Sequence, residues 1–220
     1  GGPLAKFITF VGLESAVNII IYSGLALAVV TFFLMPKNME KHHSDNIFQD
    51  FKSILSNKKI IAVSLLAGLM VGPLEGFADA WGSAFLIQVY GVEKIVANSS
   101  VLSIFLGMCA GCVVIPYIAD KINGHFATTI FSGIVMAVCF IYLLIGDAKI
   151  SYLYYLFIII GFFCSYQVII ISKISTFVPD DQSGMAAAVA NMIIMTFGWI
   201  FHNSIGYILT QKWDGAMENG

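Results

Sequence analysis

The stretch that decides the fold is IIAVSLLAGLMVGPLEGFADAWGSAFLIQVY, residues 60–90. Its only charged side chains are Glu75 and Asp79. A transmembrane helix needs about 20 mostly apolar residues, because the hydrocarbon core is about 30 Å thick and each residue adds about 1.5 Å. The stretch therefore predicts a long transmembrane helix with two acids inside it.

The rest of the chain has the same character. Of its 220 residues, 59% are hydrophobic and 11% are charged, and the mean hydropathy is +0.88, whereas soluble domains carry about 25% charged residues. Five more apolar stretches are long enough to cross a bilayer: Phe7–Leu34, Val101–Ile118, Phe126–Ile145, Tyr152–Ser172 and Met185–Thr210. The first lacks the basic start and the small-residue cleavage site of a signal peptide. We predict an all-α, polytopic membrane helix bundle whose helices run alternately up and down.

The lysines of the connections predict the orientation. The connection 36–59 is the longest, and the next one on the same side carries Lys121. The opposite side carries Lys94, Lys149 and Lys212, one in each connection. The lysines within 36–59 are Lys37, Lys41, Lys52, Lys58 and Lys59. The positive-inside rule places 36–59 in the cytoplasm, and the net charge of −2 gives no support for nucleic-acid binding.

A short amphipathic helix is predicted within that connection. Its apolar residues recur at helical spacing and are Ile47, Phe48, Phe51, Ile54 and Leu55. Ser44 or Asp45 could cap its first turn, and the helix would lie along the membrane face. The alternative interpretation is a disordered linker.

Neither metal nor enzyme chemistry is predicted. Cys109 and Cys112 form a CxxC pair, which could bind zinc or act in redox chemistry in a soluble protein. Here no second ligand pair accompanies them and all four cysteines lie in predicted spans, which favours small packing residues. The sequence also lacks the motifs of hydrolases, metalloproteases, nucleotide-binding loops and dinucleotide-binding enzymes.

Small residues predict where helices touch. Gly68, Gly72 and Gly76 recur every four residues and form a flat stripe on one face of the second span, and Gly107 and Gly111 repeat the pattern on the third. Such stripes let another helix approach closely. They could also let helices slide past each other, although packing alone explains them.

The connection IPYIADKINGH (115–125) resembles the signature Gly-x-x-x-Asp-Arg-x-Gly-Arg that joins two helices in the major facilitator superfamily. Asp120 and Lys121 occupy its Asp-Arg pair, and the resemblance implies a cytoplasmic gating role for them. The match departs at Pro116, at Asn123 and at the second basic position.

Two further stretches are similar to the same family. SGMAAAVANMIIMTFGWIFHNSIGYIL (183–209) resembles its eleventh helix, and the opening GGPL (1–4) resembles the junction of its fifth and sixth helices, although Glu14 and Ser15 stand where many members have Trp-Arg. The stretch GPLEGFADAWGSAFL (72–86) is similar to phagosomal transporters of intracellular bacteria, a group associated with amino-acid uptake.

The resemblance implies the domain organisation. Residues 1–34 would be the end of helix five and helix six, 35–59 the central cytoplasmic loop, and 60–220 helices seven to eleven of the C-terminal half. Both ends then look cut, so the expected partners include an N-terminal half and a twelfth helix elsewhere in the protein, besides the lipid bilayer. Substrate would bind near the midplane, where helices seven, eight, ten and eleven contribute from this half.

Within that frame, Glu75 and Asp79 are the leading candidates for function. A charged residue at mid-span costs about 2.5–3.5 kcal/mol and usually faces a cavity or a partner. The two acids are four residues apart and share a helix face, where their charges repel each other across about 6 Å. We expect Glu75 to carry a coupling proton or bind a substrate ammonium, with Asp79 in support. Alternatively, both lie near the outer end of the helix and form structural hydrogen bonds.

Other polar and aromatic residues are candidate cavity groups. Asn191, Met195, Gly198 and His202 follow one face of the last span, which predicts an amide and an imidazole along a cavity wall. Alternatively, His202 is an ordinary interfacial residue at the outer mouth. Further candidates for the solute or proton pathway are Tyr166, Gln167, Phe77 and Trp81, the aromatic pair for apolar or cation–π contact.

The chain contains no arginine, the usual partner of phosphates and dicarboxylates. The sequence therefore favours a cationic or zwitterionic solute, and the resemblance implies a proton-coupled symporter for an amino acid or a similar nutrient in a bacterial inner membrane. Its driving force would be the proton gradient, with no cofactor. Two alternatives remain open: an efflux pump of the same fold for drugs or siderophores, and a scaffold or receptor that transports nothing.

Overall fold

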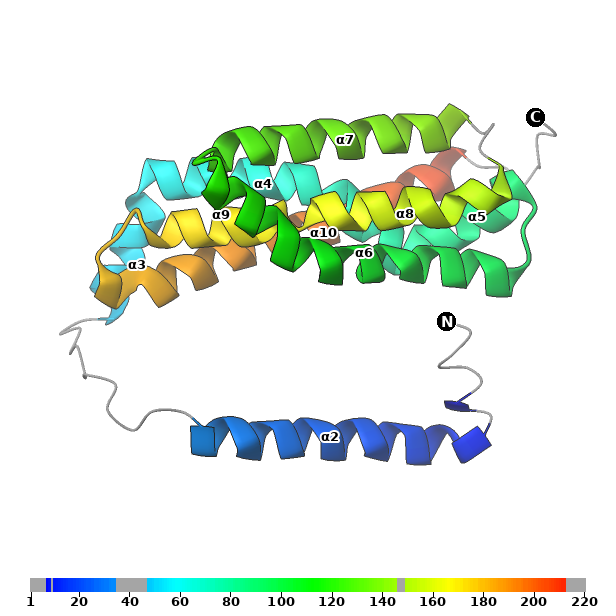
Figure 1. Ribbon diagram of the computed structural model, residues 1–220, viewed down its shortest axis with the longest axis horizontal. Coiled ribbons are helices and arrows are strands. Elements are labelled where there is room, and N and C mark those ends of the chain that lie inside the picture. Colours follow the sequence, from blue (N-terminus) through cyan, green and yellow to red (C-terminus); the bar gives the residue numbers. More distant parts are fainter. Residues whose placement is uncertain (1–6, 9, 35–46, 146–148, 213–220) are drawn as a thin grey trace. The chain divides into compact units, whose positions relative to one another are not determined.

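The computed structural model describes residues 7, 8, 10–34, 47–145 and 149–212 (Figure 1). These residues form helices and short connections, and no strand occurs among them. Six of their helices are long and apolar enough to cross a membrane: Leu13–Leu34, Lys58–Tyr90, Lys94–Lys121, His125–Ile145, Tyr152–Ser175 and Asp180–Gln211. The predicted all-α membrane architecture is confirmed. The GGPL opening and the candidate caps Ser44 and Asp45 lie outside the described residues.

The chain divides into two units, Gly1–His43 and Ser44–Gly220. The first contains α2 (Leu13–Leu34), whose side chains are apolar around most of its circumference and almost all exposed. A helix that is hydrophobic all round is typical of a membrane span.

The second unit is a bundle of the remaining helices (Figure 1). In chain order these are α3 (Ile47–Ser56), α4 (Lys58–Gly76), a π-helix (Phe77–Trp81), α5 (Gly82–Tyr90), α6 (Lys94–Lys121), α7 (His125–Ile145), α8 (Ile150–Cys164), α9 (Tyr166–Ser175), a 3₁₀ turn (Asp180–Gln182) and α10 (Ser183–Lys212). Helix α3 covers the stretch for which the sequence predicts an amphipathic helix. Helix α6 begins before the predicted Val101, because Ala97 and Ser100 of its first turns are buried in the bundle.

A tight turn joins α6 to α7. Asn123 has a φ of 49°, a left-handed conformation that asparagine tolerates better than most residues. The Gly124 N–H donates to the Ala119 carbonyl at 3.0 Å, and the Asn123 N–H donates to the Asp120 carbonyl at 3.1 Å. These bonds satisfy the last carbonyls of α6, as helix-terminating motifs do, and they let α7 return at His125.

Helices α6 and α8 approach each other through glycine. A methyl group added at Gly107 would collide with the Ile158 carbonyl, and one at Gly111 with the Phe162 carbonyl. In the other direction, a methyl at Gly161 of α8 would collide with the Ile104 carbonyl of α6. The two backbones are therefore in direct contact, which only glycine permits.

Helices α4 and α10 pack differently. Gly68 of α4 faces the Phe197 ring and Gly72 faces the Phe201 ring. Gly76 lies against Phe201 and His202, whose nearest atoms are 3.2–3.4 Å from the point that a methyl group at this glycine would occupy. The glycine stripe of α4 thus accommodates two aromatic side chains of α10 along most of its length.

The fifth span is broken at Ser165, between α8 and α9. The Ser165 hydroxyl donates to the Met108 carbonyl of α6 at 3.0 Å, and the next residue, Tyr166, donates from its hydroxyl to the Ala67 carbonyl of α4 at 3.0 Å. Tyr166 is fully buried. Ser165 and Tyr166 therefore attach the fifth span to α6 and to α4 at the same level.

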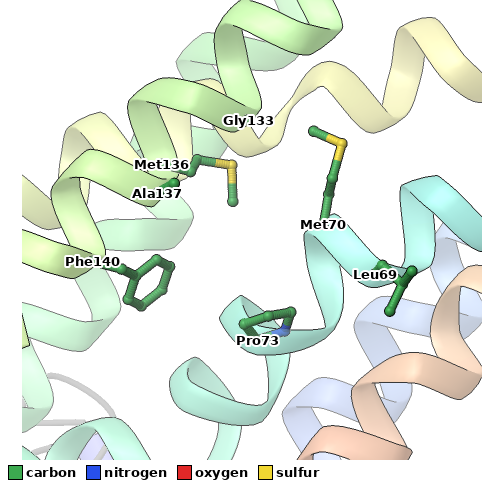
Figure 2. Close-up of a pocket in the computed structure, with 7 residues that line it drawn as sticks. All are labelled: Leu69, Met70, Pro73, Gly133, Met136, Ala137 and Phe140. Atoms are coloured by element: carbon green, nitrogen blue, oxygen red, sulfur yellow. The ribbon is translucent and has the colours of Figure 1, made fainter.

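Helix α7 lies at the outside of the bundle (Figure 1). Its outward apolar side chains are more than half exposed, as lipid-facing residues are, and they include Ile130, Phe131, Ile134, Val138 and Ile141. Between α7 and α4 lies a cavity of about 320 Å³ beside Pro73, into which Met70 extends toward Gly133 (Figure 2). Because proline lacks an N–H, the Leu69 carbonyl beside this cavity loses its usual helical donor.

Candidate functional site

The candidate site is built where the end of α4 meets α10. Glu75 lies in the last turn of α4 and is half-buried. Its carboxylate lies over Gly198 of α10, because a methyl group at that glycine would be 2.5 Å from Glu75 Oε2 and 3.2 Å from its Cβ. The missing side chain at 198 therefore provides the space that the carboxyl group occupies.

A π-helix follows Glu75 directly. Residues 77–81 make the wider i to i+5 turn, and Gly76 and Gly82 flank it. Such turns are rare and are frequent at functional sites. Gly82 is required there, since a methyl group would lie 2.9 Å from the Phe77 carbonyl oxygen. The turn carries Asp79 and Trp81.

Trp81 connects the π-helix to α10. Its Nε1–H donates to the His202 carbonyl at 3.2 Å, and the two rings are tilted by 31° with centroids 5.9 Å apart. Gly206, one turn further along α10, leaves room for the indole, whose nearest atom is 3.1 Å from a methyl position. The Trp81 ring is thus held against the α10 backbone.

The structure therefore brings four sequence-predicted residues to one region of the α4–α10 interface. Glu75 and Asp79 are close enough for their charges to interact, Asp79 and His202 are exposed, and Trp81 is half-buried. Asn191 is exposed on α10, about three turns before His202. This arrangement offers two carboxylates, an indole and an imidazole within one surface, with an amide further along the same helix.

Tyr166 and Gln167 lie elsewhere. Both are buried, and the Gln167 amide donates to the Cys164 sulfur at 3.1 Å. Tyr166 is within electrostatic range of Glu75, but its hydroxyl is bound to the Ala67 carbonyl. The Tyr166 hydroxyl joins two helices inside the bundle and the Gln167 amide bonds within its own span, so neither buried side chain lies at an open surface of the described chain.

A metal site is absent from the parts of the chain that the structure describes, where no three His, Cys, Asp or Glu side chains come together. Cys109 is exposed and Cys112 partly exposed on α6, and all four cysteines are free thiols.

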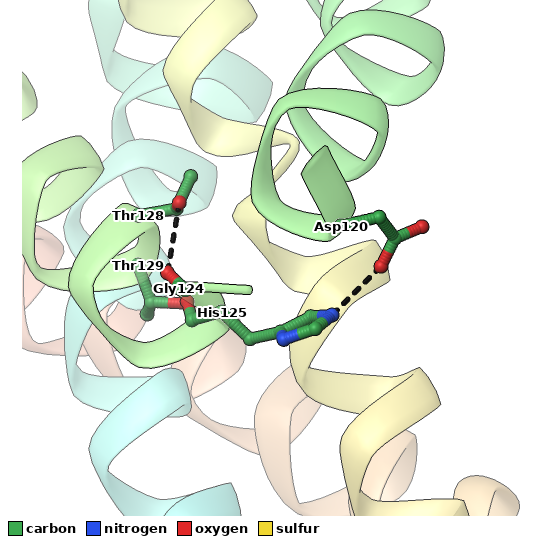
Figure 3. Close-up of polar contacts among 5 residues, drawn as sticks. All are labelled: Asp120, Gly124, His125, Thr128 and Thr129. Carbon is green, nitrogen blue, oxygen red and sulfur yellow. Dashed lines mark hydrogen bonds and ion pairs between the residues drawn. The ribbon is translucent and has the colours of Figure 1, made fainter. Parts of the chain in front are cut away.

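A second polar cluster lies at the α6–α7 turn (Figure 3). His125 Nε2 is 2.7 Å from Asp120 Oδ1, and the Thr128 hydroxyl donates to the Gly124 carbonyl at 2.9 Å. Lys121 is exposed, and its side chain forms no hydrogen bond or ion pair with another described residue. Sequence reasoning missed His125, although its position five residues after Asp120, across a tight turn, was a usable signal.

Comparison of the sequence with protein-family models finds a match to the Major Facilitator Superfamily over residues 1–201. The chain belongs to the major facilitator superfamily. No curated protein and no solved structure matches it in the corresponding comparisons. Members of this superfamily are multi-pass integral membrane transporters and not enzymes, and the six apolar helices fit that class. The predicted family resemblance is confirmed.

Proposed function

We propose that this superfamily member couples proton movement to the uptake of a small cationic or zwitterionic solute, such as an amino acid, by alternating access. The observation that carries the proposal is the position of the Glu75 carboxyl group over Gly198, at the junction of α4, the π-helix and α10. Tyr166 and Gln167 are assigned to support of the bundle behind this site.

Two physical arguments support a functional role for Glu75: the free-energy cost of a charge inside a membrane span, and the charges around its carboxylate. A charged group in the middle of a span costs about 2.5–3.5 kcal/mol, so it persists where it has a function or a partner. No salt bridge to Glu75 exists among the described residues, and the like-charged Asp79 is within electrostatic range of it. A carboxyl group in this setting can take up a proton or an ammonium group and release it again.

The site chemistry favours a positively charged or zwitterionic solute. Glu75 and Asp79 would attract an ammonium group, and the Trp81 ring offers a face for cation–π contact. His202 on α10 would contact the polar remainder of the solute, and Asn191, about three turns away, would line the pathway toward the site. The absence of arginine gives a phosphate or dicarboxylate substrate no support from this chain.

The proposed topology follows the lysine distribution. The connection 36–59 and the α6–α7 turn would lie in the cytoplasm, and the exposed polar residues of α4 and α10 would face an N-terminal half across the substrate pathway. Asp120 and Lys121 would then belong to a cytoplasmic gate, with His125 as the partner of Asp120. A bacterial inner membrane fits this arrangement.

The test is transport by the purified complete protein in proteoliposomes. Under an imposed pH gradient, accumulation is measured across a panel of amino acids for the native protein, Glu75→Gln and Glu93→Gln. Glu93 is exposed before the first turn of α6 and serves as the matched control. We expect Glu75→Gln to abolish proton-driven accumulation and Glu93→Gln to retain it.

Other outcomes separate the alternatives. Accumulation that Glu75→Gln leaves unchanged would refute the coupling role of that carboxyl group. Export of cationic drugs against a proton gradient would identify an efflux pump. A folded protein that moves no solute in either direction would favour a scaffold.

A further inference from the structure

The amphipathic helix α3 is fixed to the bundle along one edge. Ile54 is 1% exposed and packs in the hydrophobic core. Asp50 Oδ1 accepts a hydrogen bond of 2.9 Å from Gln182 Nε2, which belongs to the turn directly before α10. Helix α3 therefore has a defined orientation at the end of the bundle where α4 and α10 begin (Figure 1).

The rest of the apolar face of α3 is exposed to different degrees. Phe48 is 86% exposed, Ile47 67% and Leu55 45%. At 100° per residue, these side chains and the buried Ile54 lie within one arc of about 120° around the helix. Only the Ile54 edge of this apolar face is buried against the bundle. The described residues leave much of the remaining part exposed.

Lysines lie beside this exposed edge and at the start of the next helix. Lys52 comes directly after the Phe48 side of the arc, and Lys58 and Lys59 open the first turn of α4 immediately after α3. All three are exposed, and none forms an ion pair within the described ranges. The only acid of α3 is Asp50, which lies on the other edge and is bound to Gln182.

An exposed apolar edge beside unpaired lysines is the pattern of helices that bind anionic membranes. The position of α3 supports binding to a membrane surface, because α3 lies at the ends of helices that cross the bilayer, where lipid headgroups are found. A protein partner would need acidic groups in addition to an apolar surface, whereas an anionic leaflet supplies negative charge and hydrocarbon together.

We propose that α3 is a binding site for anionic phospholipids. Phe48, Ile47 and Leu55 enter the boundary between headgroups and acyl chains, and Lys52, Lys58 and Lys59 bind the phosphate-bearing headgroups of the same leaflet. Since the Asp50–Gln182 hydrogen bond joins α3 to the start of α10, the lipid contact is connected to the helix that carries Gly198 and His202.

The experiment uses the complete protein in vesicles and an indole introduced by Phe48→Trp. Quenching of its fluorescence by lipids brominated on the acyl chain is measured with phosphatidylglycerol and with phosphatidylcholine, and the signal of the unsubstituted protein is subtracted. Competition between the two lipids yields their relative binding constants at α3. Each lysine near an anionic surface is worth about a fivefold preference, so we expect at least about fivefold stronger binding of phosphatidylglycerol.

The lysines are then tested directly. Combining Lys52→Gln, Lys58→Gln and Lys59→Gln should bring the ratio of the two binding constants close to one, as should high salt. The matched control is Lys94→Gln with Lys149→Gln, which lie at the other end of the bundle and should leave the ratio unchanged. Leu55→Trp provides a second reporter if Phe48→Trp perturbs the protein.

Two results would overturn the proposal. Equal binding of both lipids with all lysines present would show that α3 contacts the bilayer without recognising charge. Absence of quenching from both reporters in a folded protein would show that another part of the protein covers this edge.

Discussion

The contact between α6 and α8 makes a sharp prediction for Gly107→Ala. The added methyl group would overlap the Ile158 carbonyl oxygen and would lie 2.8 Å from the Ile158 carbonyl carbon and 2.9 Å from the Phe162 nitrogen. Carbon contacts are optimal at about 3.5–4.0 Å, so the two helices must separate by a distance on the order of 1 Å. Because the obstructing atoms are backbone, no side chain can rotate away.

The magnitude follows from two opposing effects. Overpacking of a well-packed interface costs about 1–3 kcal/mol, whereas alanine is favoured over glycine inside a helix by about 1 kcal/mol. The matched control is Gly184→Ala in the first turn of α10, where a methyl group meets nothing within 4 Å. We expect Gly107→Ala to be less stable than Gly184→Ala by about 2 kcal/mol. That difference corresponds to about 4–8 °C in Tm for a chain of this size.

The assay is thermal unfolding of the purified protein in detergent, followed by near-ultraviolet circular dichroism. Gly161→Ala, on the opposite side of the same contact, should show a similar loss. The double variant should lose less than the sum of the two, because one separation of the helices accommodates both methyl groups. If Gly107→Ala matched or exceeded Gly184→Ala in Tm, the direct backbone contact between α6 and α8 would be wrong.

Two further stability predictions use the same assay. Tyr166→Phe removes the hydrogen bond to the Ala67 carbonyl and should lower the stability by about 1 kcal/mol, or the Tm by about 2–4 °C. The control Tyr155→Phe, at an exposed position, should change the Tm little. Equal Tm values for both variants would exclude a stabilising role for that bond. Asn123→Val places a β-branched residue at a φ of 49° and should cost about 1–2 kcal/mol, whereas the neighbouring Ile122→Val should be nearly neutral. An unchanged Tm in Asn123→Val would show that the turn rearranges freely.

Hydropathy predicted the spans because a bilayer imposes length and polarity on every crossing segment. The boundaries were less predictable. The first turns of α6 contain Asn98, Ser99 and Ser100 and look like a polar connection, yet tertiary burial makes them part of the helix. The break at Ser165 could not be predicted from the sequence either, since a serine within an apolar run is compatible with an unbroken helix. The feature that distinguishes this serine is its hydrogen bond to the Met108 carbonyl, which depends on tertiary structure.

The candidate site was predictable in composition and less so in geometry. Two acids in an apolar run single out Glu75 and Asp79 without any coordinates. The π-helix between Gly76 and Gly82 could not be derived, because its residues have no propensity that separates a π-turn from an α-turn. The position of Tyr166 depends equally on tertiary structure, since a mid-span tyrosine can line a cavity or join two helices, and here its hydroxyl is bound to α4.

The break in the fifth span has a mechanical consequence. Ser165 and Tyr166 attach the middle of this span to both α6 and α4, while α8 is also in direct backbone contact with α6. Bending at this point would therefore move α9 relative to α8 while the two hydroxyl bonds persist. A joint in the middle of a span allows one end of a helix bundle to rearrange while the other end keeps its packing.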